Sequence, residues 1–345
     1  MKVKLKDICT PKQWKTISTN KLKESGYPVY GANGIIGYYN EYNHEVDTLL
    51  VTCRGATCGS LNISKGKAYV NGNAMALDNL RDEIDVKYLY YYLKYRGFND
   101  VISGSAQPQI IRSTIEEIEV EIKEKREQRK IVNKCERIER LVDKIKYQQN
   151  YLDTLIKARF VEMFGDIKKL DGIRSVKLGS ICETVSGGTP STKENDYYGG
   201  DIPWISTVAL GEIFVGKEKA KDFITEKALR ESATHLIPKD SIMVGTRVGV
   251  GKCSINSCDM CTNQDINSLI NIDESKFNKV FLKFAIDEYC EYFNAIKKGA
   301  TILGITTEDL KSINIPIVSL ELQDKYVCFV RYIDKLKFDA IYHII

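Results

Sequence analysis

Apolar residues recur at every seventh position along a charged stretch in the middle of the chain. The spacing is kept by Ile131, Ile138, Ile145 and Leu152, among residues that are otherwise rich in Lys, Arg and Glu. Neither Gly nor Pro occurs from Lys123 to Phe164, and Gly165 follows as a natural helix stop. The pattern predicts one helix over 123–164, roughly 63 Å long at about 1.5 Å per residue.

The seven-residue spacing predicts a coiled-coil seam, which needs a partner helix. A second charged and apolar helix is predicted from about Glu321 to the end of the chain. The seam is expected to consist of Ile131, Ile138, Leu141, Ile145, Leu152, Leu155, Ile333 and Leu336. The alternative is one long amphipathic core helix. Basic residues outnumber acidic ones in the first helix, which fits either a solvated face or contacts with phosphate.

The chain repeats itself. The stretch "SGSAQPQIIRSTIEEIEVEI" from Ser103 lies over "KGATILGITTEDLKSINIPI" from Lys298 without a gap, and the match continues into both helices. With gaps, "VDTLLVTCRGATCGSLNI" resembles "KDSIMVGTRVGVGKCSI", which sets Arg54 against Arg247. The sequence is therefore a tandem duplication of a globular unit followed by a helix.

Each unit is predicted to be α+β. Runs such as "TLLVTC", "SIMVGT" and "IEVEI" are typical of strands, and "VKYLYYYLKYRGFNDVI" and "VFLKFAIDEYCEYFNAI" have helical periodicity. The expected domains are a first unit (1–122), a central helix (123–164), a second unit (165–317) and a C-terminal helix (318–345). Short connections predict that the helices pair as an antiparallel coiled coil with pseudo-two-fold symmetry and one unit at each end. Because the second helix is shorter, part of the first is expected to lack an intramolecular partner.

Composition, charge and cysteine spacing set further bounds. A chain of 345 residues with 43% hydrophobic residues can bury more than one core, and its net charge of +4 leaves any basic surface local. No window approaches the roughly 18 apolar residues of a membrane span, and the first residues lack a signal-peptide core, so a cytoplasmic location is expected. Ten Cys fit reduced thiols. No metal site is expected, because the pair Cys258 and Cys261 has no second pair and the three His lie far away in the sequence.

Four segments carry a family resemblance. They are "YPVYGANGIIGYYNEY" from Tyr27, "VTCRGATCGSLNI" from Val51, "VSGGTPSTKENDYYGGDIPWIS" from Val185 and "TNQDINSL" from Thr262. Two of these segments lie in each unit, and a long helix follows each unit. In this order the whole chain resembles a specificity subunit of a Type I restriction-modification system.

The resemblance implies a DNA-reading subunit with two target recognition domains, each reading one half of a bipartite sequence. The implied partners are double-stranded DNA, two adenine methyltransferase subunits and restriction motor-nuclease subunits. No cofactor is expected in this chain, since S-adenosylmethionine and ATP would bind the partner subunits. The central helix would correspond to the spacer of the family.

Candidate DNA contacts come from two sources. Arg54 and Arg247 recur in Gly-flanked turns, where an Arg can reach guanine or phosphate, although a structural Arg that bonds nearby carbonyls is the alternative. Two units that read different half-sites should differ where they read. The unlike segments supply Asn33, Lys65, Lys67, Gln107 and Gln109 in the first unit and Thr189, Ser191, Lys193 and Lys252 in the second. Any of these is alternatively a turn or solvent residue.

Catalytic signatures are missing. No Pro-Pro pair exists for the base-gripping motif of adenine methyltransferases, and "GTRVGVGKCS" has Cys253 where a phosphate-binding loop needs Ser or Thr. The chain is therefore predicted not to be an enzyme by itself. Two alternatives stay open: a non-catalytic coiled-coil protein whose duplicated heads bind protein or glycan, and an enzyme with an uncommon site in the Cys-rich second unit.

Overall fold

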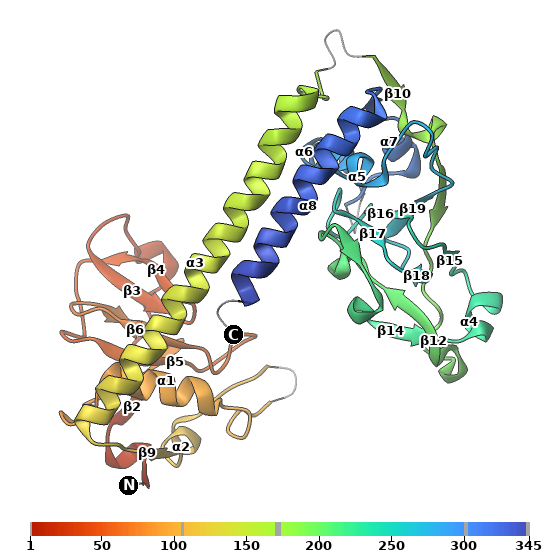
Figure 1. Ribbon diagram of the computed structural model, residues 1–345. Helices are drawn as coiled ribbons and strands as arrows, with labels where there is room; N and C mark the ends of the chain where they lie inside the picture. The colour runs from red at the N-terminus through yellow and green to blue at the C-terminus, as the bar shows by residue number, and fades with distance from the viewer. Residues whose placement is uncertain (1, 105–106, 170–173, 300–302, 343–345) are drawn as a thin grey trace. The chain divides into compact units, whose positions relative to one another are not determined.

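The computed structural model describes residues 2–104, 107–169, 174–299 and 303–342 (Figure 1). It divides into two compact units, Met1–Lys144 and Ile145–Ile345. The boundary falls inside the 40-residue helix α3 (Lys125–Phe164), which lies within the range where the sequence predicts a helix. The four-part division into domains stays a prediction. None of the described helices is long and apolar enough to cross a membrane.

Unit 1 contains nine strands and two α-helices before α3 among its described residues. They are β1 (Lys2–Lys4), β2 (Thr10–Gln13), β3 (Tyr27–Gly31), β4 (Gly34–Tyr39), β5 (Thr48–Thr52), β6 (Leu61–Ser64), β7 (Tyr69–Val70), β8 (Ala74–Asp78), α1 (Val86–Arg96), α2 (Arg112–Ile115) and β9 (Glu119–Glu121). They form the sheets β2-β8-β5-β6, β4-β3-β7 and β1-β9. The core lies between the four-stranded sheet and α1, where Leu49, Met75 and Leu89 are buried.

Unit 2 has the same kinds of element in a larger frame. Its strands are β10 (Ser175–Lys177), β11 (Glu183–Ser186), β12 (Tyr198–Ile205), β13 (Phe214–Val215), β14 (Asp222–Ile224), β15 (Leu236–Ile237), β16 (Ile242–Gly245), β17 (Cys253–Asn256), β18 (Met260–Thr262), β19 (Ile266–Ile270) and β20 (Asn314–Pro316). Its helices are α4 (Glu226–Glu231), α5 (Lys279–Asp287), α6 (Cys290–Ile296), α7 (Thr307–Lys311) and α8 (Leu320–Tyr342). The sheets are β11-β19-β16-β17-β13, β14-β12-β18-β15 and β10-β20. The α+β prediction is confirmed.

The duplication is visible in how each unit closes. β1 pairs antiparallel with β9, and β10 pairs antiparallel with β20, so the first and last strands of each unit lie together. A cysteine follows the first strand in both copies. The Sγ of Cys9 donates to the carbonyl of Leu5, and that of Cys182 to the carbonyl of Leu178, each at 3.3 Å. The two copies therefore share their local construction as well as their sequence pattern.

Within unit 2, α8 runs antiparallel to the second half of α3 (Figure 1). Tyr326, early in α8, is fully buried against Phe160, late in α3, with ring centroids 5.4 Å apart. Lys337, late in α8, pairs with Asp153, early in this half of α3, at 2.5 Å. The predicted antiparallel pairing of the two helices is thus found.

The predicted seam residues differ in how deeply they are buried. Ile333 is 3% exposed, and Leu152 packs against the core of unit 2. The others are half-buried or exposed: Ile131, Ile138, Leu141, Ile145, Leu155 and Leu336. In unit 2 the buried line of α3 follows a spacing of four residues, through Ile156 and Phe160, because each helix packs on a globular core as well as on the other helix. A coiled-coil partner for Ile131, Ile138 and Leu141 stays a prediction.

Candidate DNA interface

In unit 1, three loops meet: the turn that joins β5 to β6, the turn that joins β3 to β4, and the loop that carries Gln109. Arg54 follows β5, and its backbone forms a bridge with Gln109 from a distant loop. The N–H of Gly55 donates to the carbonyl of Pro108 at 3.0 Å. The Thr57 hydroxyl donates to Oδ1 of Asn33, in the turn between β3 and β4, at 2.7 Å. These contacts hold the three loops in a fixed arrangement, which we call the unit 1 loop cluster.

Four predicted residues therefore come together in the unit 1 loop cluster. Asn33, Arg54, Gln107 and Gln109 all lie in its loops, and all four side chains are exposed. Gly104 supports the loop that carries the two Gln residues, since its φ is +85° and a Cβ there would lie 2.6 Å from the carbonyl oxygen of Gln107. The cluster presents guanidinium and amide groups, the types that bind base edges.

Lys65 and Lys67 lie elsewhere. β6 pairs with β5 so that Leu61 is opposite Val51, next to the cluster, whereas Ser64 is opposite Thr48 at the far end. Lys65 follows that far end, and its Nζ pairs with Asp47 at 3.3 Å. The structure does not bring these two lysines to the unit 1 loop cluster, because the strand carries them away from it.

In unit 2, an acidic residue forms an ion pair with Arg247, the arginine equivalent to Arg54. Arg247, whose side chain is 51% exposed, lies 3.7 Å from the largely buried carboxylate of Asp265. The other carboxylate oxygen of Asp265 accepts a hydrogen bond from Nδ2 of Asn263 at 3.1 Å. Gly304 leaves room for the Arg side chain, since a Cβ there would lie 2.9 Å from Cγ of Arg247. Both the segment "TNQDINSL" and the loop of Gly304 therefore position Arg247.

The glycine pair of "VSGGTP" packs against this same segment. A Cβ on Gly187 would lie 2.2 Å from the carbonyl oxygen of Asn263, and one on Gly188 would lie 2.2 Å from that of Ala233. The close approach brings Thr189 to Gln264, to which it is hydrogen bonded. Exposed Thr189, Arg247 and Gln264 together form what we call the unit 2 loop cluster. The sequence analysis does not predict Gln264 as a contact, although Gln264 lies within the family segment "TNQDINSL".

The other candidates of unit 2 are placed differently. Ser191 and Lys193 are exposed in the loop that follows Pro190, and the hydroxyl of Ser191 accepts the backbone N–H of Lys193 at 3.3 Å. Lys252 lines a cleft of about 750 Å³ that also includes Lys283 and Asp287. The structure gives none of these three a contact with the unit 2 loop cluster.

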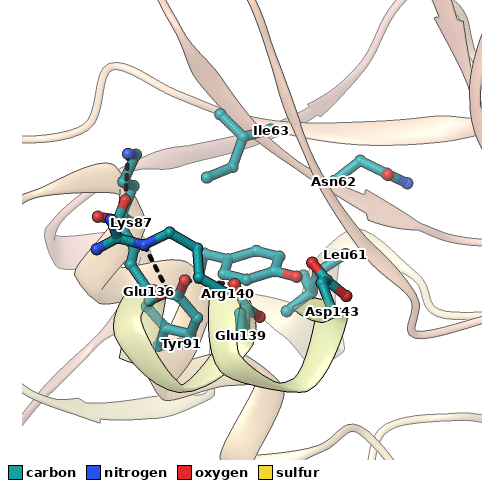
Figure 2. A pocket seen from close by; sticks show the side chains of 10 residues that line it. Leu61, Asn62, Ile63, Lys87, Tyr91, Glu136, Glu139, Arg140 and Asp143 are labelled. Carbon is teal, nitrogen blue, oxygen red and sulfur yellow. Dashed lines mark hydrogen bonds and ion pairs between the residues drawn. The ribbon is translucent and has the colours of Figure 1, made fainter. Parts of the chain in front are cut away.

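Unit 1 has a cleft of about 620 Å³ between β6, α1 and the first half of α3 (Figure 2). Two ion pairs join α1 to α3 at this cleft. Lys87 pairs with Glu136, while Glu139 accepts from Tyr91 at 2.7 Å and from Lys94 at 2.9 Å. Burial raises the pKa of Tyr91, and hydrogen bonds from Lys94 and Tyr91 lower the pKa of Glu139. These contacts fasten α1 to α3.

Two buried cysteines have raised pKa values. Burial raises the pKa of Cys261 to about 11 and that of Cys9 to about 12, so few of these thiols are ionised near neutral pH. Within the part of the chain that the structure describes, no group of three or more His, Cys, Asp and Glu residues is placed to hold a metal ion.

Comparisons with known proteins identify the family. The family model described as the Type I restriction modification DNA specificity domain matches residues 1–152 and 171–344. A Type I restriction enzyme specificity subunit of Methanocaldococcus jannaschii is 32% identical over 161 residues, which are 46% of this chain and 37% of that protein. A putative Type I specificity subunit of Haemophilus influenzae is 22% identical over 333 residues, covering 89% of this chain and 80% of that protein.

Solved structures agree on the fold. The crystal structure of a Type I restriction-modification S subunit from M. genitalium has a TM-score of 0.56 at 16% identity, covering 99% of this chain and 91% of that one. The match to the M. jannaschii relative spans less than two thirds of that protein. The family model, in contrast, matches both units and nearly the whole sequence. The chain belongs to the family of Type I restriction-modification DNA specificity subunits.

Proposed function

We propose that this chain selects the DNA target of a Type I restriction-modification complex, and that each unit reads one half of a bipartite sequence. The observation that carries the proposal is the pair of exposed loop clusters. Each is built around an arginine at an equivalent position of the repeat, Arg54 in one unit and Arg247 in the other.

The neighbours of the two arginines support separate half-sites. Arg54 lies among Asn33 and Gln109, whereas Arg247 lies among Asp265 and Gln264. Arginine pairs with guanine in the major groove, and Asn or Gln with adenine, so different neighbours favour different bases. A shared scaffold with different side chains is what a protein needs to read two sequences with one fold.

The chemistry would belong to partner subunits. We propose that two adenine methyltransferase subunits and the restriction motor-nuclease subunits assemble on this chain and bind S-adenosylmethionine and ATP themselves. The family is that of specificity subunits, which agrees with the prediction that this chain is not an enzyme by itself. The exposed apolar side chains of α3, Ile131 and Ile138 among them, offer contact area for such partners.

The proposal is tested by co-expressing the chain with the methyltransferase encoded beside its gene. N6-methyladenine is then mapped across the host DNA by single-molecule sequencing, with the methyltransferase alone as control. A new two-part motif with a fixed gap is the expected result. An active complex that adds no such motif would disprove the proposal, and binding to protein or glycan would then become the better hypothesis.

A further inference from the structure

The β3–β4 hairpin exposes two consecutive isoleucines. Ile35 is 53% exposed and Ile36 is 43% exposed, although both belong to β4. The strand register shifts between the pairs Tyr30↔Ile35 and Val29↔Gly37, which leaves Ile36 without a partner on β3. Such a bulge redirects side chains, and bulges are over-represented next to functional sites.

The rest of the hairpin keeps these side chains accessible. β4 is an edge strand of its sheet. A bridge with Lys23 covers the edge at Tyr38, but no described bridge covers it at Ile35 or Ile36. Gly31, on the facing strand, makes room for Ile36, because a Cβ there would lie 2.9 Å from its Cγ2 atom. The two isoleucines therefore form a small apolar patch at the end of the hairpin.

The patch follows directly after the turn that carries Asn33, a residue of the unit 1 loop cluster. Asn33, two residues before Ile35, accepts the hydrogen bond of Thr57, and Thr57 lies in the same loop as Arg54. A ligand that covers both the patch and the loop cluster must therefore offer apolar and hydrogen-bonding groups side by side. The major groove does so, because the thymine methyl group lies beside the donors and acceptors of the base edges. A purely apolar partner would leave the guanidinium and amide groups unpaired.

We propose that Ile35 and Ile36 contact the methyl group of a thymine in the half-site that unit 1 reads. The inference rests on the proposed function and names one base feature that unit 1 recognises. The isoleucines distinguish thymine from cytosine by the methyl group, while Arg54 and Gln109 supply hydrogen bonds to neighbouring bases.

The test uses the complex with the methyltransferase and a duplex that carries its methylation motif. Thymines of each half-site in turn are replaced by deoxyuridine, which lacks only the methyl group. For the wild-type complex we expect an affinity loss of about fourfold at one half-site, the effect of one buried methyl group. For Ile35→Ser with Ile36→Ser, we expect a similar loss on the thymine duplex and no further loss on the deoxyuridine duplex.

Three controls accompany these variants. Val46→Ser removes a side chain of the same unit that is 71% exposed, and it should leave the deoxyuridine effect intact. Ile35→Val with Ile36→Val keeps an apolar patch and should also retain the deoxyuridine effect. Unchanged selection at the remaining bases of the unit 1 half-site shows that unit 1 of the serine variant is folded.

The outcomes separate the two proposals. A wild-type complex without any deoxyuridine effect, or a serine variant that keeps the full effect, overturns the thymine contact and leaves the proposed function standing. A serine variant that no longer co-purifies with the methyltransferase shows that the patch contacts protein, which also overturns it. A wild-type complex that methylates no two-part motif overturns the proposed function, and the thymine contact with it.

Discussion

Gln128 and Gln323 make the same three hydrogen bonds, one residue in each repeat. The Oε1 of Gln128 accepts the backbone N–H of Asp85 at 2.8 Å, and that of Gln323 accepts the N–H of Asn278 at 2.8 Å. Asp85 and Asn278 are the N-caps of α1 and α5. Each Gln also donates to two backbone carbonyls and is 0% exposed. Each long helix is thus joined to the helix of its unit through one buried amide.

Replacing either glutamine should destabilise the protein. Gln128→Ala or Gln323→Ala leaves a buried N–H and two carbonyls without their partner, which costs about 1–3 kcal/mol. Denaturant unfolding measures the change in the free energy of unfolding. Gln148→Ala, an exposed position of α3, is the matched control and should change it by less than about 0.5 kcal/mol. Equal stability of all three variants would mean that the amide contacts are dispensable.

Substituting Gly188 should disturb the second half-site through the unit 2 loop cluster. Gly188→Ala places a Cβ 2.2 Å from the carbonyl oxygen of Ala233, so the chain must shift next to Thr189. We expect lower stability and weaker selection at one half-site of the methylation motif, with the other unchanged. Thr192→Ala, an exposed residue of the same loop that is not among the candidate contacts, serves as control. An unaltered motif in both variants would argue against a recognition role for this cluster.

The two arginines should act on different half-sites. Arg54→Ala is expected to relax one half and Arg247→Ala the other, at a cost of about 1–3 kcal/mol if each pairs with guanine. Asp265→Asn should resemble a mild form of Arg247→Ala, because it weakens the ion pair that positions the guanidinium. Lys15→Ala removes an exposed cation of unit 1 that is not among the candidate contacts and is the control. The methylation map gives the readout, and loss at both halves in either Arg variant would contradict independent reading.

Thiol labelling should follow burial and pKa. Cys328 is exposed, whereas Cys253 and Cys261 are buried. Burial raises the pKa of Cys261 to about 11, so its thiolate fraction rises about tenfold per pH unit until the pH nears that value. Iodoacetamide labelling followed by mass spectrometry should modify Cys328 first, and Cys261 only slowly and increasingly toward high pH. Rapid labelling of Cys261 at pH 7 would show that this part of unit 2 opens easily.

The sequence predicts the long helix and the repeat well, because both leave signals that extend over many residues. Helical periodicity and the absence of Gly and Pro over 123–164 identify α3, and the ungapped match between the repeats identifies the duplication. The seam is predicted less well. Leu155 was expected in it, but α3 in unit 2 buries the adjacent Ile156, since the globular core decides which line of the helix faces inward.

The candidate DNA contacts could be predicted only in part. The sequence predicts Asn33 and Gln109 because they differ between the repeats, and the folded loops bring them to the loop of Arg54. Lys65 met the same criterion, yet its strand carries it away. The sequence does not predict Ile35, because only the tertiary structure shows that its side chain is exposed. Sequence differences identify candidates, whereas chain direction and exposure decide among them.

The core of unit 2 has a consequence for biosynthesis. The strands of unit 1 close on one another when β9 pairs with β1, so this unit can fold while the ribosome is still translating the second repeat. Unit 2 buries Phe160 of α3 against Tyr326 of α8, and α8 is translated after all the strands of unit 2. The core of unit 2 therefore cannot close until α8 has been translated. Until then Phe160 lacks this partner, which exposes the nascent chain to aggregation and proteolysis while unit 2 is being made.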